Sequence, residues 1–197
     1  MRASILLAAG ILATFSGVAS AQVTLNAFMT ADNAFAASLS TDPTAAGDSN
    51  FLTGNNWGST FNASVQITAP GTYYLQILAQ DFGDPASFIA ELGLMNFQPG
   101  WSATFSNNFT TLLTNTTDWT VSNQGFGINP IAPVVINGAD GVGPWGDRPL
   151  ISNNALNIWH PSNPDNAYFT TVITVVPTPG AIALLGMGGL VATRRRR

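Results

Sequence analysis

The chain contains no cysteine and no lysine, and each absence excludes a class of function. Without cysteine it has no disulfide, no thiolate nucleophile and no cysteine-ligated zinc site. Proteins that bind nucleic acids neutralise phosphate groups with lysine and arginine, so the lack of lysine argues against a nucleic-acid partner. The folded state must be stabilised by packing or by bound ions.

Charged residues make up only 8% of the chain, and the basic ones are concentrated at its two ends. Five of the six arginines, Arg2 and residues 194–197, lie in the terminal segments. The part between them has Arg148 and ten acidic residues, which gives it a net charge of −9. The acids are scattered, so no segment has the pattern of a disordered acidic tail.

Residues 1–21 have the pattern of a secretory signal peptide. Arg2 precedes an apolar run over residues 5–18, and small residues follow at Ala19 and Ala21, as signal peptidase requires. Gln22 is then the predicted first residue of the mature chain. We expect a signal helix over residues 1–21 and export from the cytoplasm.

Residues 175–197 combine a proline and glycine breaker, an apolar segment over 181–192 and a basic end. Positively charged flanks of this kind stay on the cytoplasmic side of a membrane. The apolar segment is shorter than the roughly 20 residues that a spanning helix needs, and its glycines weaken a helix. The pattern predicts a short membrane-addressed helix that suits a transient signal better than a permanent anchor.

This tail resembles the PEP-CTERM sorting tails of Gram-negative bacteria, with threonine in place of the glutamate of the Pro-Glu-Pro core. The resemblance implies transient association with the inner membrane and an exosortase-like enzyme that processes the tail and places the protein outside the cell. The residues that carry the resemblance are Pro177, Thr178, Pro179, Gly180, Arg194, Arg195, Arg196 and Arg197. A short tail anchor or a C-terminal core helix is the alternative interpretation.

Residues 22–174 are predicted to form one β domain, because apolar and polar residues alternate with period two. Strands are expected at residues 23–30, 35–39, 61–67, 73–79, 88–94 and 168–176, with a further one within 110–121. Residues 73–79 are apolar on nearly both faces, which predicts a central strand. Residues 125–149 are rich in glycine and proline and are expected to form loops. Helical periodicity is absent from this part, so the predicted fold is an all-β antiparallel sandwich or jelly roll.

Residues 28–94 resemble the galactose-binding-like jelly-roll modules attached to bacterial surface glycosidases. The resemblance implies a fold and is an analogy at that level. It rests on Thr30-Ala31-Asp32-Asn33, Gly54-Asn55-Asn56-Trp57, Pro70-Gly71-Thr72-Tyr73-Tyr74-Leu75 and Pro85-Ala86-Ser87-Phe88-Ile89-Ala90-Glu91.

The five tryptophans all lie in or beside polar or turn-rich sequence: Trp57, Trp101, Trp119, Trp145 and Trp159. Exposed aromatic rings stack on sugar rings, while Asn and Asp side chains bind hydroxyl groups. The predicted ligand-binding residues are therefore Asp32, Asn33, Trp57, Asp81, Asp84 and Trp145, with extracellular polysaccharide as the partner. The alternative is that these large aromatics close the ends of the sandwich.

No catalytic residue is predicted. His160 is the one histidine, it is expected in a surface loop, and no nucleophile-elbow motif accompanies it. Asp81, Asp84 and Glu91 are the nearest set for the two carboxyl groups of a glycoside hydrolase. A secreted glycoside-active enzyme that uses these acids is the alternative function.

No cofactor is predicted, and calcium is the metal that the acids suit best. Hard oxygen ligands from Asp32 with Asn33, or from Asp81 with Asp84, match its preference. Turn-capping by the same side chains is the alternative interpretation. The sequence as a whole predicts an exported, non-enzymatic protein of the cell surface or extracellular matrix, with a role in adhesion or structural association.

Overall fold

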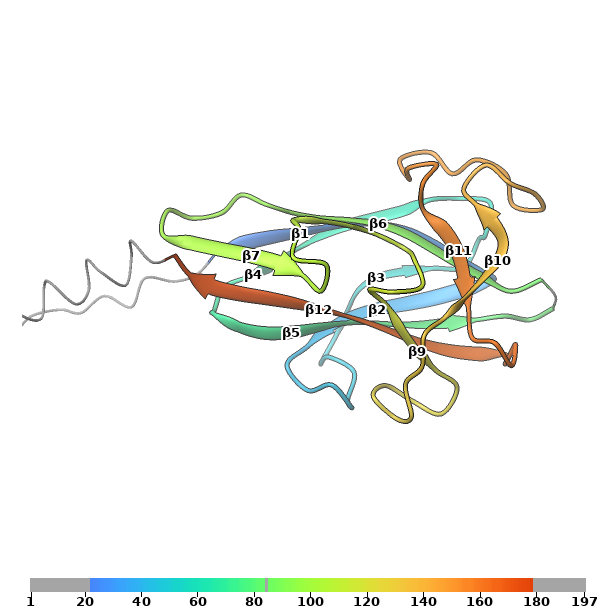
Figure 1. Cartoon of the computed structure of the whole chain (residues 1–197), viewed down its shortest axis with the longest axis horizontal. Helices are drawn as coiled ribbons and strands as arrows, with labels where there is room; N and C mark the ends of the chain where they lie inside the picture. The colour runs from blue at the N-terminus through green and yellow to red at the C-terminus, as the bar shows by residue number, and fades with distance from the viewer. Residues whose placement is uncertain (1–21, 84, 179–197) are drawn as a thin grey trace, which may run out of the picture.

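The computed structural model describes residues 22–83 and 85–178. Within these ranges the chain forms two antiparallel sheets that face each other (Figure 1). No helix in this part of the chain is long and apolar enough to cross a membrane. The two predicted terminal helices, with Ala19, Ala21, Pro179, Gly180 and residues 194–197, lie outside the described residues.

The two sheets have six strands each in the described part of the chain. The first has the order β10 (Val134–Ala139), β11 (Leu156–Trp159), β6 (Ser87–Met95), β1 (Val23–Asp32) and β4 (Phe61–Ile67), with β8 (Thr111–Leu113) also paired to β6. The second has the order β3 (Asn50–Gly54), β2 (Ala34–Ser40), β5 (Gly71–Gln80), β12 (Asn166–Pro177) and β7 (Trp101–Phe105), with β9 (Thr120–Ser122) also paired to β12.

The inner faces of both sheets enclose one apolar core, as the period-two pattern predicts. On β1, Val23, Leu25, Ala27 and Met29 are fully buried and face the core, and the residues between them face the other side of the sheet. Residues from the second sheet, such as Phe169, belong to the same cluster. The all-β class and the two-layer sandwich are therefore confirmed, and the jelly-roll connectivity remains a prediction.

Four aromatic side chains fill one region of this core. Phe88 on β6 lies 4.8 Å from Phe169 on β12 and 5.4 Å from Trp119, measured between ring centroids. Trp159 lies 5.6 Å from Phe169. The indole nitrogens of Trp119 and Trp159 donate to the carbonyls of Leu113 and Pro164, each at 3.2 Å. These two tryptophans thus serve packing and have no free face for a ligand.

Several predicted strands agree with the structure, and others do not. Residues 73–79 lie in β5, which is central between β2 and β12, as predicted. The predicted strand within 110–121 is instead two short strands, β8 and β9, in different sheets. The break comes at Asn115, whose Oδ1 accepts hydrogen bonds from the backbone N–H groups of Thr117 and Asp118 at 2.8 and 2.7 Å. Such a side chain competes with a strand ladder for the backbone.

One turn holds both ends of the described chain, and we call it the chain-end turn (residues 96–100). Gln98 N–H donates to Gln22 O at 3.1 Å, and Thr178 N–H donates to Gly100 O at 2.8 Å. β12 runs to Pro177, beyond the predicted boundary at 174/175, and Val175 is buried in the core. Both ends therefore leave the sandwich together, away from β10 and β11 (Figure 1).

Candidate functional site

The predicted ligand-binding residues that the structure describes lie together at the end of the sandwich opposite the chain-end turn. We call this region the loop end (residues 32–33, 55–60, 81–83 and 140–148). Asp32 ends β1, and Asp81 directly follows β5. Trp57 and Trp145 come from the loops before β4 and after β10. Asp84 lies outside the described residues.

Asp32 anchors a distant loop through Trp145. The indole N–H of Trp145 donates to Asp32 Oδ2 at 2.9 Å, and both side chains are buried. Trp57 differs, because 44% of its surface is exposed. The guanidinium carbon of Arg148 lies 5.5 Å from the centre of the Trp57 ring, within cation–π distance. Trp57 is therefore the member of the cluster that a ligand can reach directly.

Arg148 is buried among acidic groups, with only 5% of its surface exposed. Burial lowers its pKa, whereas the charges of Asp140, Asp32 and Asp147 raise it. Burial raises the pKa of Asp140. Both carboxylate oxygens of Asp140 accept from the backbone N–H of Arg148, each at 3.1 Å. The sequence did not predict Arg148 as a site residue, although its isolation as the only cation between the terminal segments was a signal.

The charged groups of this cluster are incompletely paired. Among the described residues, Arg148 Nε and Nη2 and Asp32 Oδ1 are buried without a hydrogen-bond partner. Unpaired buried groups are rare in folded proteins because each costs about 1–3 kcal/mol. The space around them is lined by both tryptophans and is too narrow to hold a water-sized molecule. At the loop end, the buried charged groups bind neighbouring loops, and the ring of Trp57 is exposed to solvent.

The side chains of Asn33 and Asp81 hold the turn after β5. Phe82 N–H donates to Asn33 Oδ1 at 2.6 Å, and Gly83 N–H donates to Asp81 Oδ1 at 3.0 Å. The Asp81 contact, with an N–H two residues on, is of the turn-capping kind that the alternative interpretation predicts, whereas the Asn33 contact joins residues 49 positions apart. In residues 22–83 and 85–178, no group of three or more histidine or acidic side chains is placed to hold a metal ion.

The two described carboxylates of the glycosidase alternative belong to different sheets. Glu91 lies on β6 and accepts a hydrogen bond from Ser152 N–H at 2.8 Å. Asp81 follows β5 in the other sheet and caps its own turn. Each carboxylate therefore has a structural role in fixing a loop.

His160 is buried, with 7% of its surface exposed, so the prediction of a surface-loop histidine was wrong. The residue does follow β11 in a loop, but its ring turns inward and accepts a hydrogen bond from Ser162 N–H at Nδ1, at 3.1 Å. A backbone N–H can only donate, so Nδ1 carries no proton. Burial lowers the pKa of the ring.

Acidification should therefore destabilise the fold through His160. The unfolded chain takes up a proton near the ordinary histidine pKa of about 6.5, and the folded chain only at lower pH, so stability falls as pH drops through this range. Urea unfolding at about pH 7.5 and about pH 5.5 measures the loss. His160→Asn keeps an acceptor for Ser162 and should show a smaller loss. An equal loss in both proteins would contradict this role.

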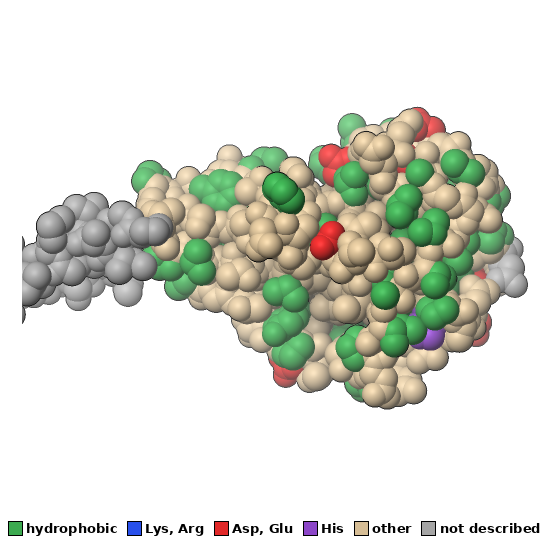
Figure 2. Space-filling model, viewed as in Figure 1, with side chains coloured by type: hydrophobic (Ala, Val, Ile, Leu, Met, Phe, Trp, Pro, Cys, Tyr) green, Lys and Arg blue, Asp and Glu red, His purple; other side chains and the backbone are tan. Residues whose placement is uncertain are grey.

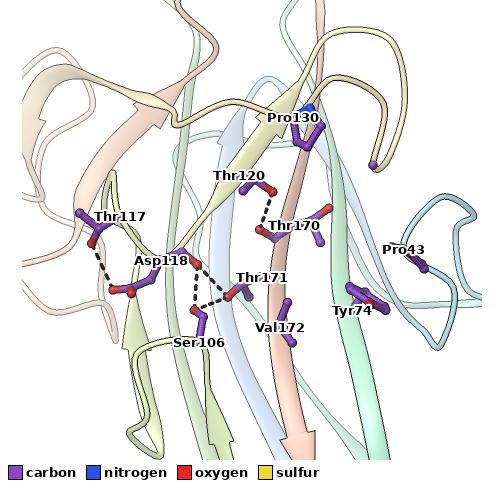
Figure 3. A pocket seen from close by; sticks show the side chains of 11 residues that line it. Pro43, Tyr74, Ser106, Thr117, Asp118, Thr120, Pro130, Thr170, Thr171 and Val172 are labelled. Carbon is purple, nitrogen blue, oxygen red and sulfur yellow. Dashed lines mark hydrogen bonds between the residues drawn. The ribbon is translucent and has the colours of Figure 1, made fainter.

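A second hollow, which no sequence pattern predicts, lies on the outer face of the second sheet (Figure 3). We call it the outer-face groove. Its volume is about 360 Å³, and Tyr74 of β5 and Val172 of β12 are among its lining residues. Further lining residues come from the loop after β2, from the segment after β7, from residues 117–120 and from the loop after β9, which explains why no local pattern predicts the groove.

Comparison with known proteins identified no relative of this chain. The chain matched no protein family, no curated protein and no solved structure. The two resemblances, at the tail and at residues 28–94, therefore remain predictions. Function has to be inferred from the sequence pattern and from the geometry of the loop end and the outer-face groove.

Proposed function

We propose that this chain is an exported, non-enzymatic protein of the cell surface or extracellular matrix. Its role is adhesion or structural association with extracellular polysaccharide. The observation that carries the proposal is the position of the chain ends. Gln22, the predicted first mature residue, and Thr178, within the predicted tail, are both hydrogen-bonded to the chain-end turn.

This arrangement suits a β-sandwich that is exported and attached to a surface through one end of the molecule. Gln22 and Thr178, the first and last described residues, both contact the chain-end turn. The loop end lies at the far end of the long axis (Figure 1), where a membrane or surface attachment leaves it accessible. Signal peptidase and an exosortase-like enzyme are the processing partners, and contact with the inner membrane is transient.

The surface chemistry supports a neutral, hydroxyl-rich partner. Figure 2 shows a face with few acidic and no basic side chains, on which uncharged atoms dominate. Asn, Ser and Thr side chains both donate and accept hydrogen bonds, as sugar hydroxyls do. The non-enzymatic assignment is supported by Glu91 and His160, since Glu91 binds a backbone N–H of the loop before β11 and His160 binds one in its own loop.

Cell fractionation tests the proposal in a Gram-negative host that carries an exosortase. The full chain should be recovered outside the inner membrane. A variant with Arg194→Gln, Arg195→Gln, Arg196→Gln and Arg197→Gln should lose this sorting and accumulate at the inner membrane or in the periplasm, because the tail no longer has its basic flank. A control without residues 2–21 should stay in the cytosol. Recovery of the full-length chain in the cytosol would contradict the proposal.

A further inference from the structure

The outer-face groove has the features of a preformed binding site (Figure 3). Its volume of about 360 Å³ lies within the range of roughly 300–1,000 Å³ that small-molecule sites occupy. Tyr74, Thr170 and Val172 contribute from the sheet. Pro43, Pro130 and Asp118 contribute from three surrounding segments.

Two loops that form one wall are fixed to the sheet and to each other. The buried amide of Gln76 donates through Nε2 to the carbonyls of Asp42 and Pro43, at 3.1 and 3.2 Å. Gly127 has a φ of 66°, and a Cβ atom on it would lie 2.8 Å from the carbonyl oxygen of Pro43. Glycine therefore permits the close approach of the two loops. Ser122 Oγ, which donates to Ile128 O at 2.5 Å, holds the second loop.

The opposite wall is fixed by hydroxyl groups. The carbonyl of Asp118 accepts from Ser106 Oγ and from Thr171 Oγ1, each at 3.0 Å. The carboxylate of Asp118 accepts from Asn115 Nδ2 at 2.9 Å. Both walls are thus ordered before any ligand arrives, which lowers the entropic cost of binding.

The lining selects the class of ligand. It contains five hydroxyl side chains besides Tyr74, two prolines, one carboxylate and no cation: Ser106, Thr117, Thr120, Thr170, Thr171, Tyr74, Pro43, Pro130 and Asp118. Hydroxyl groups and a carboxylate match sugar hydroxyls. Aromatic and apolar rings match the C–H faces of a sugar. An anionic sugar is disfavoured by Asp118 and by the net charge of −9 between the terminal segments.

The groove offers little to an extended peptide. Strand addition needs an unpaired sheet edge. β12, which contributes Thr170 and Val172, is paired with β5 on one side and with β7 and β9 on the other. Over most of its length, β12 therefore has no row of unpaired backbone groups to which a peptide strand could bind.

We propose that the outer-face groove binds a neutral sugar chain, with Tyr74 as the stacking ring and Asp118 and the surrounding hydroxyls as hydrogen-bond partners. The choice of polysaccharide as partner rests on the proposed function. The site itself is defined by its own geometry, so binding by the purified chain can be measured independently of export.

Calorimetric titration of the purified full-length chain tests this site. The probes are neutral glucan, mannan and galactan tetrasaccharides, a tetrameric oligouronate and a proline-rich peptide. At least one neutral tetrasaccharide should bind, and Tyr74→Ala should weaken its binding about tenfold. Thr120→Trp, which fills the groove from an exposed position, should weaken it by at least as much. Val135→Ala, at an exposed position of β10 in the other sheet, should leave the affinity within about twofold. Trp57→Ala tests the loop end as a rival sugar site.

The outcomes separate the groove from the proposed function. If no neutral tetrasaccharide binds, or if the oligouronate or the peptide binds more tightly, the groove proposal is overturned while export stands on its own test. If a neutral tetrasaccharide binds but only Trp57→Ala weakens it, the sugar site is the loop end and the groove proposal is again overturned. Thermal unfolding of each variant shows whether a loss of binding reflects a loss of folding, and Tyr74→Phe, which keeps the ring, should retain most of the affinity.

Discussion

Phe88→Ala should lower the free energy of unfolding by about 4 kcal/mol, the largest effect expected from any single change in this chain. Phe88 is fully buried and contacts Trp119 and Phe169 at 5.4 and 4.8 Å between ring centroids. It belongs to β6 and Phe169 belongs to β12, so this contact joins the two sheets. Removing the ring leaves a cavity that the surrounding strands cannot close, because each is held by its own ladder.

Urea unfolding followed by circular dichroism measures this loss. Phe109→Ala is the matched control, since 68% of that ring is exposed. We expect the control to change stability by no more than about 0.5 kcal/mol. A loss at Phe88 as small as that of the control would mean that the two sheets do not pack through this cluster.

Asp32→Ala should destabilise the fold by about 3 kcal/mol. The change leaves the buried Trp145 indole N–H without its acceptor, which now lies 2.9 Å away. It also removes one of the acidic charges that favour the buried Arg148 cation. Asp32→Asn keeps an acceptor for Trp145 and should cost about half as much. Asp48→Ala, at an exposed position, is the control.

A double variant separates the two contributions of Asp32. In Asp32→Ala with Arg148→Met, the uncompensated cation is gone and the cluster becomes apolar. Replacing buried charges by apolar groups of similar volume is often neutral, so the double variant should be more stable than Asp32→Ala alone. If the two changes add without coupling in urea unfolding, Asp32 and Arg148 do not interact in the folded protein.

The sequence predicts the longer strands well because their alternation is set by one buried face. β1, β4, β5, β6 and β12 all fall where the pattern places them. The prediction fails at the shorter strands β3, β7, β10 and β11. β10 carries Asn137 and Gly138, both with positive φ, and its pairing with β11 shifts register between Val135 and Ala139. A strand with such an irregularity shows no period-two pattern.

The candidate sites are less predictable than the fold, since long-range contacts assemble them. Residue type identifies Asp32 and Trp145 as candidates, but their hydrogen bond joins residues 113 positions apart. The outer-face groove depends on a loop that Gln76 holds to the sheet and on the close approach of that loop to Gly127. Neither residue stands out in the sequence, because glutamine in a strand and glycine in a loop are common.

The central proposal is that both terminal segments are removable address signals on an exported β-sandwich. Intact-mass measurement of the protein recovered from outside the cells tests this claim most directly. We expect a chain that begins at Gln22 and lacks residues 194–197. We further expect its C-terminus at or beyond Thr178, because β12 and the chain-end turn hold the backbone up to that residue. A mature protein that retains residues 1–21 or keeps the four terminal arginines would contradict the account.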